Sequence, residues 1–232
     1  MTVPVIETES AYETAATGSS FTIDKPTGTS EGDLLICHAA LYRGFLPTIT
    51  VPSGWSVGDE TYWGFSMVSL WYYKIAGGSE PSSYTWSYDD SSIRPTVHML
   101  RISGVDQASP INVDGYTATA GETPSVTTDV DDCLILRLCN YRTNPGGEVT
   151  WATSTEQYDE ANSYGQACDI SGAYASKPTA GSTGTESVSG TGSIASGYTI
   201  AIAPDGGGGG GGAAVGRGLT ISQKLSRTSL AG

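Results

Sequence analysis

Apolar and polar residues alternate along many short runs of this chain, and turn-forming residues separate the runs. A period of two residues is typical of β-strands, and nowhere does an apolar period of 3.6 persist for the length of a helix. Strong turn signals such as 51–54 (Val-Pro-Ser-Gly) lie between the runs. The pattern predicts strands near residues 20–23, 33–42, 66–76, 83–88, 95–103, 124–127, 132–141, 165–174, 186–189 and 197–203. It therefore predicts an all-β fold, a jelly-roll-like antiparallel β-sandwich.

The predicted strand at residues 66–76 is apolar on both faces. Val68 and Leu70 lie on one face, and Met67 and Trp71 on the other. A strand of this kind is covered on both sides. One cover would be the core of the sandwich. For the other cover, a loop and a neighbouring subunit are alternatives, and we favour the subunit.

Two segments of the chain resemble each other. Residues 32–43 align without gaps with residues 131–142, and five of the twelve positions are identical. From Asp33 to the end of the last strand of the first copy is 70 residues, and from Asp132 to the end of the second copy is 71. The spacing predicts an internal duplication of two similar sets of strands. A chance similarity between two apolar strands is the alternative.

The β-type pattern ends at seven consecutive glycines, residues 206–212. The residues before them contain eight Lys or Arg against 24 Asp or Glu, whereas the last twenty residues carry three cationic side chains and no carboxylate. We divide the chain into an N-terminal arm (1–19), a β-sandwich domain (20–204), a polyglycine linker (205–212) and a basic C-terminal anchoring tail (213–232). A flexible tether between an acidic body and a basic peptide predicts attachment to a larger assembly.

Charge and segment composition exclude several classes of function. The net charge of −13 opposes binding to nucleic-acid phosphates and to anionic membranes. No positively charged, apolar leader opens the chain and no run of about 18 apolar residues occurs, so we expect assembly in a cytoplasm. Free thiols that pack as small apolar side chains suit that compartment. We interpret all four cysteines in this way: Cys37, Cys133, Cys139 and Cys168.

Few residues are candidates for chemistry. His38 and His98 lie on apolar faces of predicted strands, which favours structural histidines over a catalytic base. There is no Cys-x-x-Cys pair and no histidine pair at helical spacing, which argues against zinc. Clustered aspartates lack the spacing of a calcium loop, and we interpret them as solvated turn residues: Asp89, Asp90, Asp129, Asp131 and Asp132. We predict no cofactor and no metal.

A glycan-cleaving enzyme would require two carboxylates at a hydrolase separation. The spacing of Asp59, Glu60 and Glu80 does not call for one, and we predict no enzymatic activity. Tyr62 and Trp63 are candidate glycan contacts, because aromatic rings can stack on the apolar face of a sugar.

The basic tail carries the strongest functional signal. Aliphatic and cationic side chains alternate in it, so the peptide would fit an apolar groove with acidic rims on a partner. A disordered, solubilising end is the alternative. The residues predicted to anchor the chain are Arg217, Leu219, Ile221, Lys224, Leu225 and Arg227.

Several motifs occur in a characteristic order: Pro26-Thr-Gly-Thr, Glu31-Gly-Asp-Leu-Leu-Ile36, Pro52-Ser-Gly-Trp55, Trp71-Tyr-Tyr-Lys-Ile-Ala76, Ser79-Glu-Pro-Ser-Ser-Tyr-Thr-Trp86, Ile102-Ser-Gly-Val-Asp106 and Gly197-Tyr-Thr-Ile-Ala-Ile-Ala-Pro204. Together with the glycine-rich stretch and short tail, they resemble β-sandwich proteins of bacteriophage virions, namely capsid decoration and tail-fibre-like modules. The resemblance covers residues 20–204 and implies the fold and the setting. It carries over no catalytic residue.

The leading hypothesis is a structural phage virion protein that decorates or cements the capsid exterior as a homotrimer. Its partners would be the major capsid protein or other virion proteins, and it would be assembled in the host cytoplasm. The alternative is a tail-fibre or receptor-binding protein that recognises host surface glycan. Neither hypothesis involves nucleic acid or a membrane. Many copies over the head would indicate decoration, whereas a few at the tail would indicate a fibre.

Overall fold

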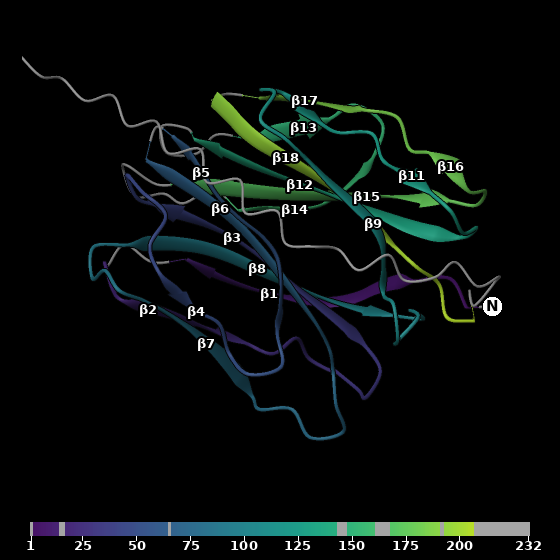
Figure 1. Cartoon of the computed structure of the whole chain (residues 1–232), viewed down its shortest axis with the longest axis horizontal. Coiled ribbons are helices and arrows are strands. Elements are labelled where there is room, and N and C mark those ends of the chain that lie inside the picture. The colour runs from purple at the N-terminus through teal and green to yellow at the C-terminus, as the bar shows by residue number, and fades with distance from the viewer. Residues whose placement is uncertain are drawn as a thin grey trace, which may run out of the picture.

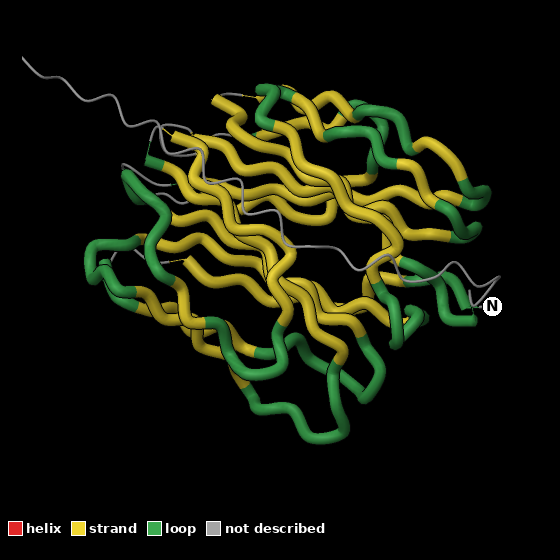
Figure 2. Tube along the Cα trace, viewed as in Figure 1, coloured by secondary structure: helices red, strands yellow, loops and turns green. Residues whose placement is uncertain are grey.

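The computed structural model describes residues 2–13, 17–64, 66–142, 148–160, 168–190 and 193–206. Within these residues all regular structure is β-strand, joined by loops and turns (Figure 2). Two five-stranded antiparallel sheets form the centre of the molecule, with strand orders β1-β8-β3-β6-β5 and β14-β15-β12-β18-β9 (Figure 1). The all-β sandwich predicted from the sequence is confirmed. Its finer description as a jelly roll stays a prediction.

The first half of the chain supplies eight strands: β1 (Val5–Glu13), β2 (Ser20–Asp24), β3 (Leu34–Tyr42), β4 (Ile49–Thr50), β5 (Ser56–Gly64), β6 (Met67–Ile75), β7 (Ser83–Tyr88) and β8 (Arg94–Ser103). The second half supplies ten: β9 (Ile111–Thr117), β10 (Glu122–Thr123), β11 (Thr127–Thr128), β12 (Cys133–Arg142), β13 (Val149–Trp151), β14 (Thr155–Glu160), β15 (Asp169–Lys177), β16 (Gly181–Ser182), β17 (Glu186–Gly190) and β18 (Ser193–Ile202).

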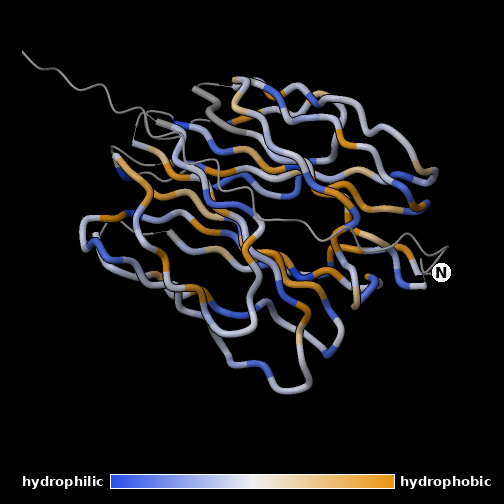
Figure 3. The backbone as a smooth tube through the Cα atoms, viewed as in Figure 1, coloured by the Kyte–Doolittle hydropathy of each residue, from blue (hydrophilic) through white to orange (hydrophobic). Residues whose placement is uncertain are grey.

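Smaller sheets cover the outer faces of the two inner sheets (Figure 1). On the first half, β2-β7-β4 covers the inner sheet, and Phe21 and Trp86 of this cover pack with Leu35 and Leu70. On the second half, β10-β17-β13 plays the same part, and the short pair β11-β16 adjoins it. The central strands are therefore buried on both faces and read as nearly continuous apolar runs, visible along the tube in Figure 3.

This layering explains the two apolar faces of β6. Met67 and Trp71 join the core between the two inner sheets, whereas Val68 and Leu70 join the outer core beneath β7. The second cover is therefore a sheet of the same chain. The neighbouring subunit that we favoured from the sequence is wrong for this strand.

The two halves repeat the same strand order. Read from the chain start of each half, β1-β8-β3-β6-β5 corresponds to β9-β18-β12-β15-β14. Irregularities recur as well, because the first strand of each half skips one residue against its neighbour, at Glu7 and at Asn112. Each central strand follows a residue with positive φ, Gly32 (90°) and Asp132 (58°). The topology thus repeats as the predicted duplication requires.

The structure corrects the register of that repeat. Leu34 and Ile36 of β3 face the core between the inner sheets, and so do Leu134 and Leu136 of β12, so equivalent residues of the central strands lie 100 positions apart. The pairs His38–His98 and Leu138–Tyr198 agree with this offset. The gapless alignment of residues 32–43 with 131–142 implies 99 and is wrong by one residue. Because successive side chains point to opposite faces, that slip would exchange the inner and outer face of the strand.

Residues at both ends of the described chain lie side by side. Val5–Glu13 were expected within an N-terminal arm, but they form β1, the edge strand of the first inner sheet. Thr2 forms a bridge with Asp205, whose backbone N–H donates to the carbonyl of Gly104 (2.8 Å). The chain therefore leaves the body next to the start of β1. The described residues include no helix with the length and apolar character needed to cross a bilayer.

Candidate functional site

The residues predicted to anchor the tail, Arg217, Leu219, Ile221, Lys224, Leu225 and Arg227, lie outside the described residues, as does the linker from Gly207 onward. What the structure does fix is the point from which they depart. Asp205 is held between Thr2 and Gly104, so the linker begins at a defined position on the body.

The candidate glycan contacts do not form a joint platform. Tyr62 and Trp63 are consecutive in the edge strand β5, so their side chains point to opposite sides. Tyr62 is 42% exposed, whereas Trp63 packs against the inner core. Tyr62 alone offers an aromatic ring to solvent at this position.

The carboxylates considered for glycan cleavage have other partners. Glu80 accepts hydrogen bonds from Lys74 Nζ (2.7 Å) and from the Tyr84 hydroxyl (2.7 Å), and Glu60 accepts one from the Tyr72 hydroxyl (2.8 Å). Asp59 accepts one from Thr61 Oγ1 (2.8 Å). Burial is the main cause that raises the pKa of Glu60, and the charge of Asp59 adds to it. The hydrogen bond from Tyr72 acts in the opposite direction but is outweighed. These carboxylates have roles within the fold.

Two of the clustered aspartates accept hydrogen bonds from backbone N–H groups in turns. Asp131 accepts a hydrogen bond from the backbone N–H of Ala180 (2.7 Å), and Asp90 accepts one from that of Ser92 (2.7 Å). Among the described residues, no three His, Cys, Asp or Glu side chains gather in a way that could hold a metal ion. All four cysteines are free and buried.

The most concentrated polar chemistry lies between the two inner sheets, around His38. The Tyr158 hydroxyl lies 2.7 Å from Nδ1 of His38, and Oδ1 of Asn140 lies 3.0 Å from Nε2. Burial lowers the pKa of His38 to about 3, against the opposing effect of Asn140, so the ring is neutral. Asn140 donates its amide to the Ala39 carbonyl (3.4 Å), which turns its oxygen toward His38. Nε2 therefore carries the proton, and Nδ1 accepts from Tyr158.

His98 continues this network toward the surface. Its ring is stacked on Tyr158 with centroids 3.8 Å apart and an angle of 6° between the planes. Nδ1 lies 3.2 Å from Glu160, and Nε2 lies 3.2 Å from Glu9, which also accepts from Gln157 (2.9 Å). Burial alone would lower the pKa of His98, but the hydrogen bonds to Glu160 and Glu9 outweigh it, and the pKa is raised.

These contacts show what the histidine network can do. Both ring nitrogens of both histidines have partners, and each ring is at most 2% exposed. A general base needs a nitrogen within hydrogen-bond reach of a substrate, and neither ring offers one here. As predicted, the ring nitrogens of both histidines are satisfied by hydrogen bonds within the fold. Sequence reasoning missed Glu9, Tyr158 and Glu160, because they lie in edge strands without an apolar alternation.

A second buried charge lies on the outer face of β12. Arg137 donates to the hydroxyls of Thr123 (2.8 Å) and Thr199 (3.0 Å) and to the Gly184 carbonyl (3.0 Å). Its Nε lies 3.9 Å from Glu186. This arginine joins β12 to the outer strands of the second half, where the first half uses aromatic packing.

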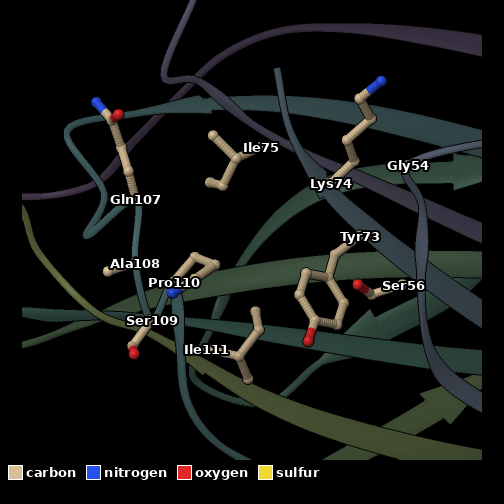
Figure 4. Close-up of a pocket in the computed structure, with 10 residues that line it drawn as sticks. All are labelled: Gly54, Ser56, Tyr73, Lys74, Ile75, Gln107, Ala108, Ser109, Pro110 and Ile111. Atoms are coloured by element: carbon tan, nitrogen blue, oxygen red, sulfur yellow. The ribbon is translucent and has the colours of Figure 1, made fainter. Parts of the chain in front are cut away.

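A pocket of about 400 Å³ opens beside the segment that joins the two halves (Figure 4). Tyr73, Pro110 and Ile111 line it with apolar surface, and Ser56 and Gln107 add polar groups. The volume suits a small ligand. Lys74 also lines the pocket, and its charge is paired with that of Glu80 (2.7 Å).

No protein-family model, curated protein or solved structure matches this chain.

Proposed function

We propose that this chain is a structural component of a bacteriophage virion, which decorates and cements the capsid exterior through its basic tail. The observation that carries the proposal is the division of charge along the chain. A body with eight cationic and 24 acidic side chains is joined by seven glycines to a peptide with three cationic and no acidic ones. The body itself is a layered sandwich whose buried cysteines and histidines are engaged in packing and hydrogen bonds.

The tail would act by multivalent attachment. A tether of seven glycines with random-coil statistics would reach about 15 Å, which would let the peptide contact a partner surface close to Asp205. In a homotrimer, or in a lattice of copies, each weak contact becomes intramolecular once its neighbours are bound. Many such contacts to the major capsid protein would stiffen the shell without any chemical reaction.

Removal of the tail tests this function. A chain that ends at Gly206 should remain folded and soluble but should no longer join particles. Replacing Arg217, Lys224 and Arg227 by Glu in the full chain should have the same effect. The matched control replaces Lys25 and Lys177 of the body by Glu and should incorporate normally. The readout is the copy number per purified particle, and normal incorporation of the truncated chain would refute the proposal.

A tail-fibre or receptor-binding protein is the second candidate, and the pocket beside Tyr73 favours it. An aromatic ring next to hydroxyl and amide groups is the combination that neutral sugars bind. If this candidate is right, the full chain binds host surface polysaccharide, Tyr73→Ala weakens that binding, and only a few copies occur per particle. Copy number thus separates the two functions.

A further inference from the structure

The two halves meet along two edges of the sandwich, and the duplicated fold makes these edges equivalent. At one edge β1 and β14 approach each other, since Gln157 of β14 donates to Glu9 of β1 (2.9 Å). The strands that correspond to them are β9 and β5 at the other edge. His98 lies at the first edge, in the strand β8 that pairs with β1. Tyr198 lies at the equivalent position of the second edge, in the strand β18 that pairs with β9.

At the first edge, His98 connects three strands of the two halves. It lies in β8 and contacts Glu9 of β1 and Glu160 of β14, each at 3.2 Å. The ring is 2% exposed, whereas the side chains of Glu9 and Glu160 are 38% and 31% exposed. Protons therefore have access to the carboxylates while the ring itself is enclosed.

The charged and titratable groups that face His98 come from each element packed around it. They are Glu9 from β1, His38 from β3, and Tyr158 and Glu160 from β14. The part of β15 that pairs with these β14 residues supplies Ile170, Ser171 and Gly172, which do not titrate near neutral pH. His38 is neutral and the hydroxyl of Tyr158 is committed to it, so the two carboxylates dominate the surroundings of His98.

We propose that Glu9, His98 and Glu160 form a proton-dependent clamp, which holds the edge strands β1 and β14 of the two halves together and loosens when His98 loses its proton. A protonated ring donates to both carboxylates at once. A neutral ring has only one N–H, so its other nitrogen presents a lone pair to a carboxylate and that contact becomes repulsive. The proposal does not depend on the virion role.

The direction of the pH effect follows from the same contacts. His98 has a higher pKa in the folded chain than its ordinary value of 6.5. The clamp therefore contributes its full stability below about pH 6.5 and loses it as the pH rises through the folded-state pKa. Above that point β1 and β14 should open locally more often, while the core of the sandwich stays closed.

The equivalent edge provides an internal control. Burial and the nearby carboxylate of Asp59 raise the pKa of Tyr198 well above its ordinary value. Tyr198 thus stays neutral across the range in which His98 titrates. Strand β9 should therefore show no comparable pH dependence, whereas β5 is a poorer control because burial raises the pKa of its Glu60.

The test uses the full chain and two measurements on it. Histidine resonances in NMR give the pKa of His98, which should lie above 6.5. Amide hydrogen exchange between about pH 5 and pH 9, corrected for the intrinsic rate, gives the opening of each strand. From low to high pH, the fraction of time in which β1 and β14 are open should rise. The expected rise is about tenfold for each unit by which the pKa of His98 in the closed state exceeds its pKa in the open state.

Variants separate the clamp from general stability. His98→Gln should abolish the pH dependence of β1 and β14, and Glu160→Gln should lower the pKa of His98. Tyr198→Phe is the matched control and should leave both unchanged. If His98 in the unmodified chain titrates at or below 6.5, or if β1 and β14 open equally at all pH values in this range, the clamp does not exist. Both of these outcomes are measured on the unmodified chain, so the test stands even if His98→Gln fails to fold.

Discussion

Trp71 and Tyr158 lie at equivalent edges of the two inner sheets, and each covers a glycine in the neighbouring strand. Trp71 of β6 lies over Gly58 of β5, whereas Tyr158 of β14 lies over Gly172 of β15. The aromatic residue and the glycine have thus exchanged strands between the halves. An aromatic ring that packs over a strand glycine protects the backbone there from solvent and helps to fix the register.

Adding a methyl group at either glycine should therefore be costly. The new Cβ of Gly58→Ala would overlap the ring of Trp71, and that of Gly172→Ala the ring of Tyr158. Each change should lower the free energy of unfolding by about 1–3 kcal/mol, measured by urea denaturation. Gly44→Ala, where no atom lies within 4 Å of the new Cβ, is the control and should change it by less than about 0.5 kcal/mol. Equal stability of the three variants would contradict this packing.

The sequence predicted which single side chains are buried, but it did not predict which distant side chains contact each other. The alternation of apolar neighbours put His38 and His98 on buried faces, and the structure confirms both. It gave no sign that Tyr158 lies between them, because that contact joins residues 120 positions apart in the chain. Local periodicity reports which face is buried and not which distant strand lies against it.

At the scale of elements, the sequence revealed the centre of each sheet and missed its edges. All six inner-sheet strands that were predicted, β3, β6, β8, β12, β15 and β18, lie in the interior of a sheet. The four that were missed, β1, β5, β9 and β14, are the four edges. Edge strands carry charged residues and lack a continuous apolar run, since they must not pair with other chains. Their composition, as in Thr-Glu-Gln-Tyr-Asp-Glu of β14, resembles that of a loop.

The same arrangement predicts an order of local stability. Strands β3 and β12 are paired on both sides and covered on both faces, so their amides should exchange most slowly with solvent. The edge strands β5 and β9 should exchange faster, because only one side of each is paired within its sheet. Hydrogen exchange resolved by residue, at a fixed pH below 6.5, measures this order. Faster exchange in β12 than in β9 would show that the layers do not cover the centre as described.

For the whole molecule, the duplication raises the question of whether each half is a folding unit. Each half has an outer core of its own, but both contribute to the core between the inner sheets. Leu34, Ile36 and Leu100 from the first half pack there with Leu136 and Ile200 from the second. Separating the halves would expose an apolar sheet face on each, and soluble monomers rarely tolerate a large patch of this kind.

Residues 1–106 expressed alone should therefore not persist as a folded monomer. The half retains the aromatic outer core around Trp86, so it should keep strand structure while it associates through its exposed inner face. Because the missing half has the same strand order, a second copy can take its place, and a dimer is the expected product.

Light scattering coupled to gel filtration gives the mass, and circular dichroism reports the strands. The second half, with its smaller outer cores and the buried Arg137, should be the less stable of the two. A folded monomer of residues 1–106 would show that the core between the sheets is dispensable, and the chain would then be two domains in contact instead of one layered body.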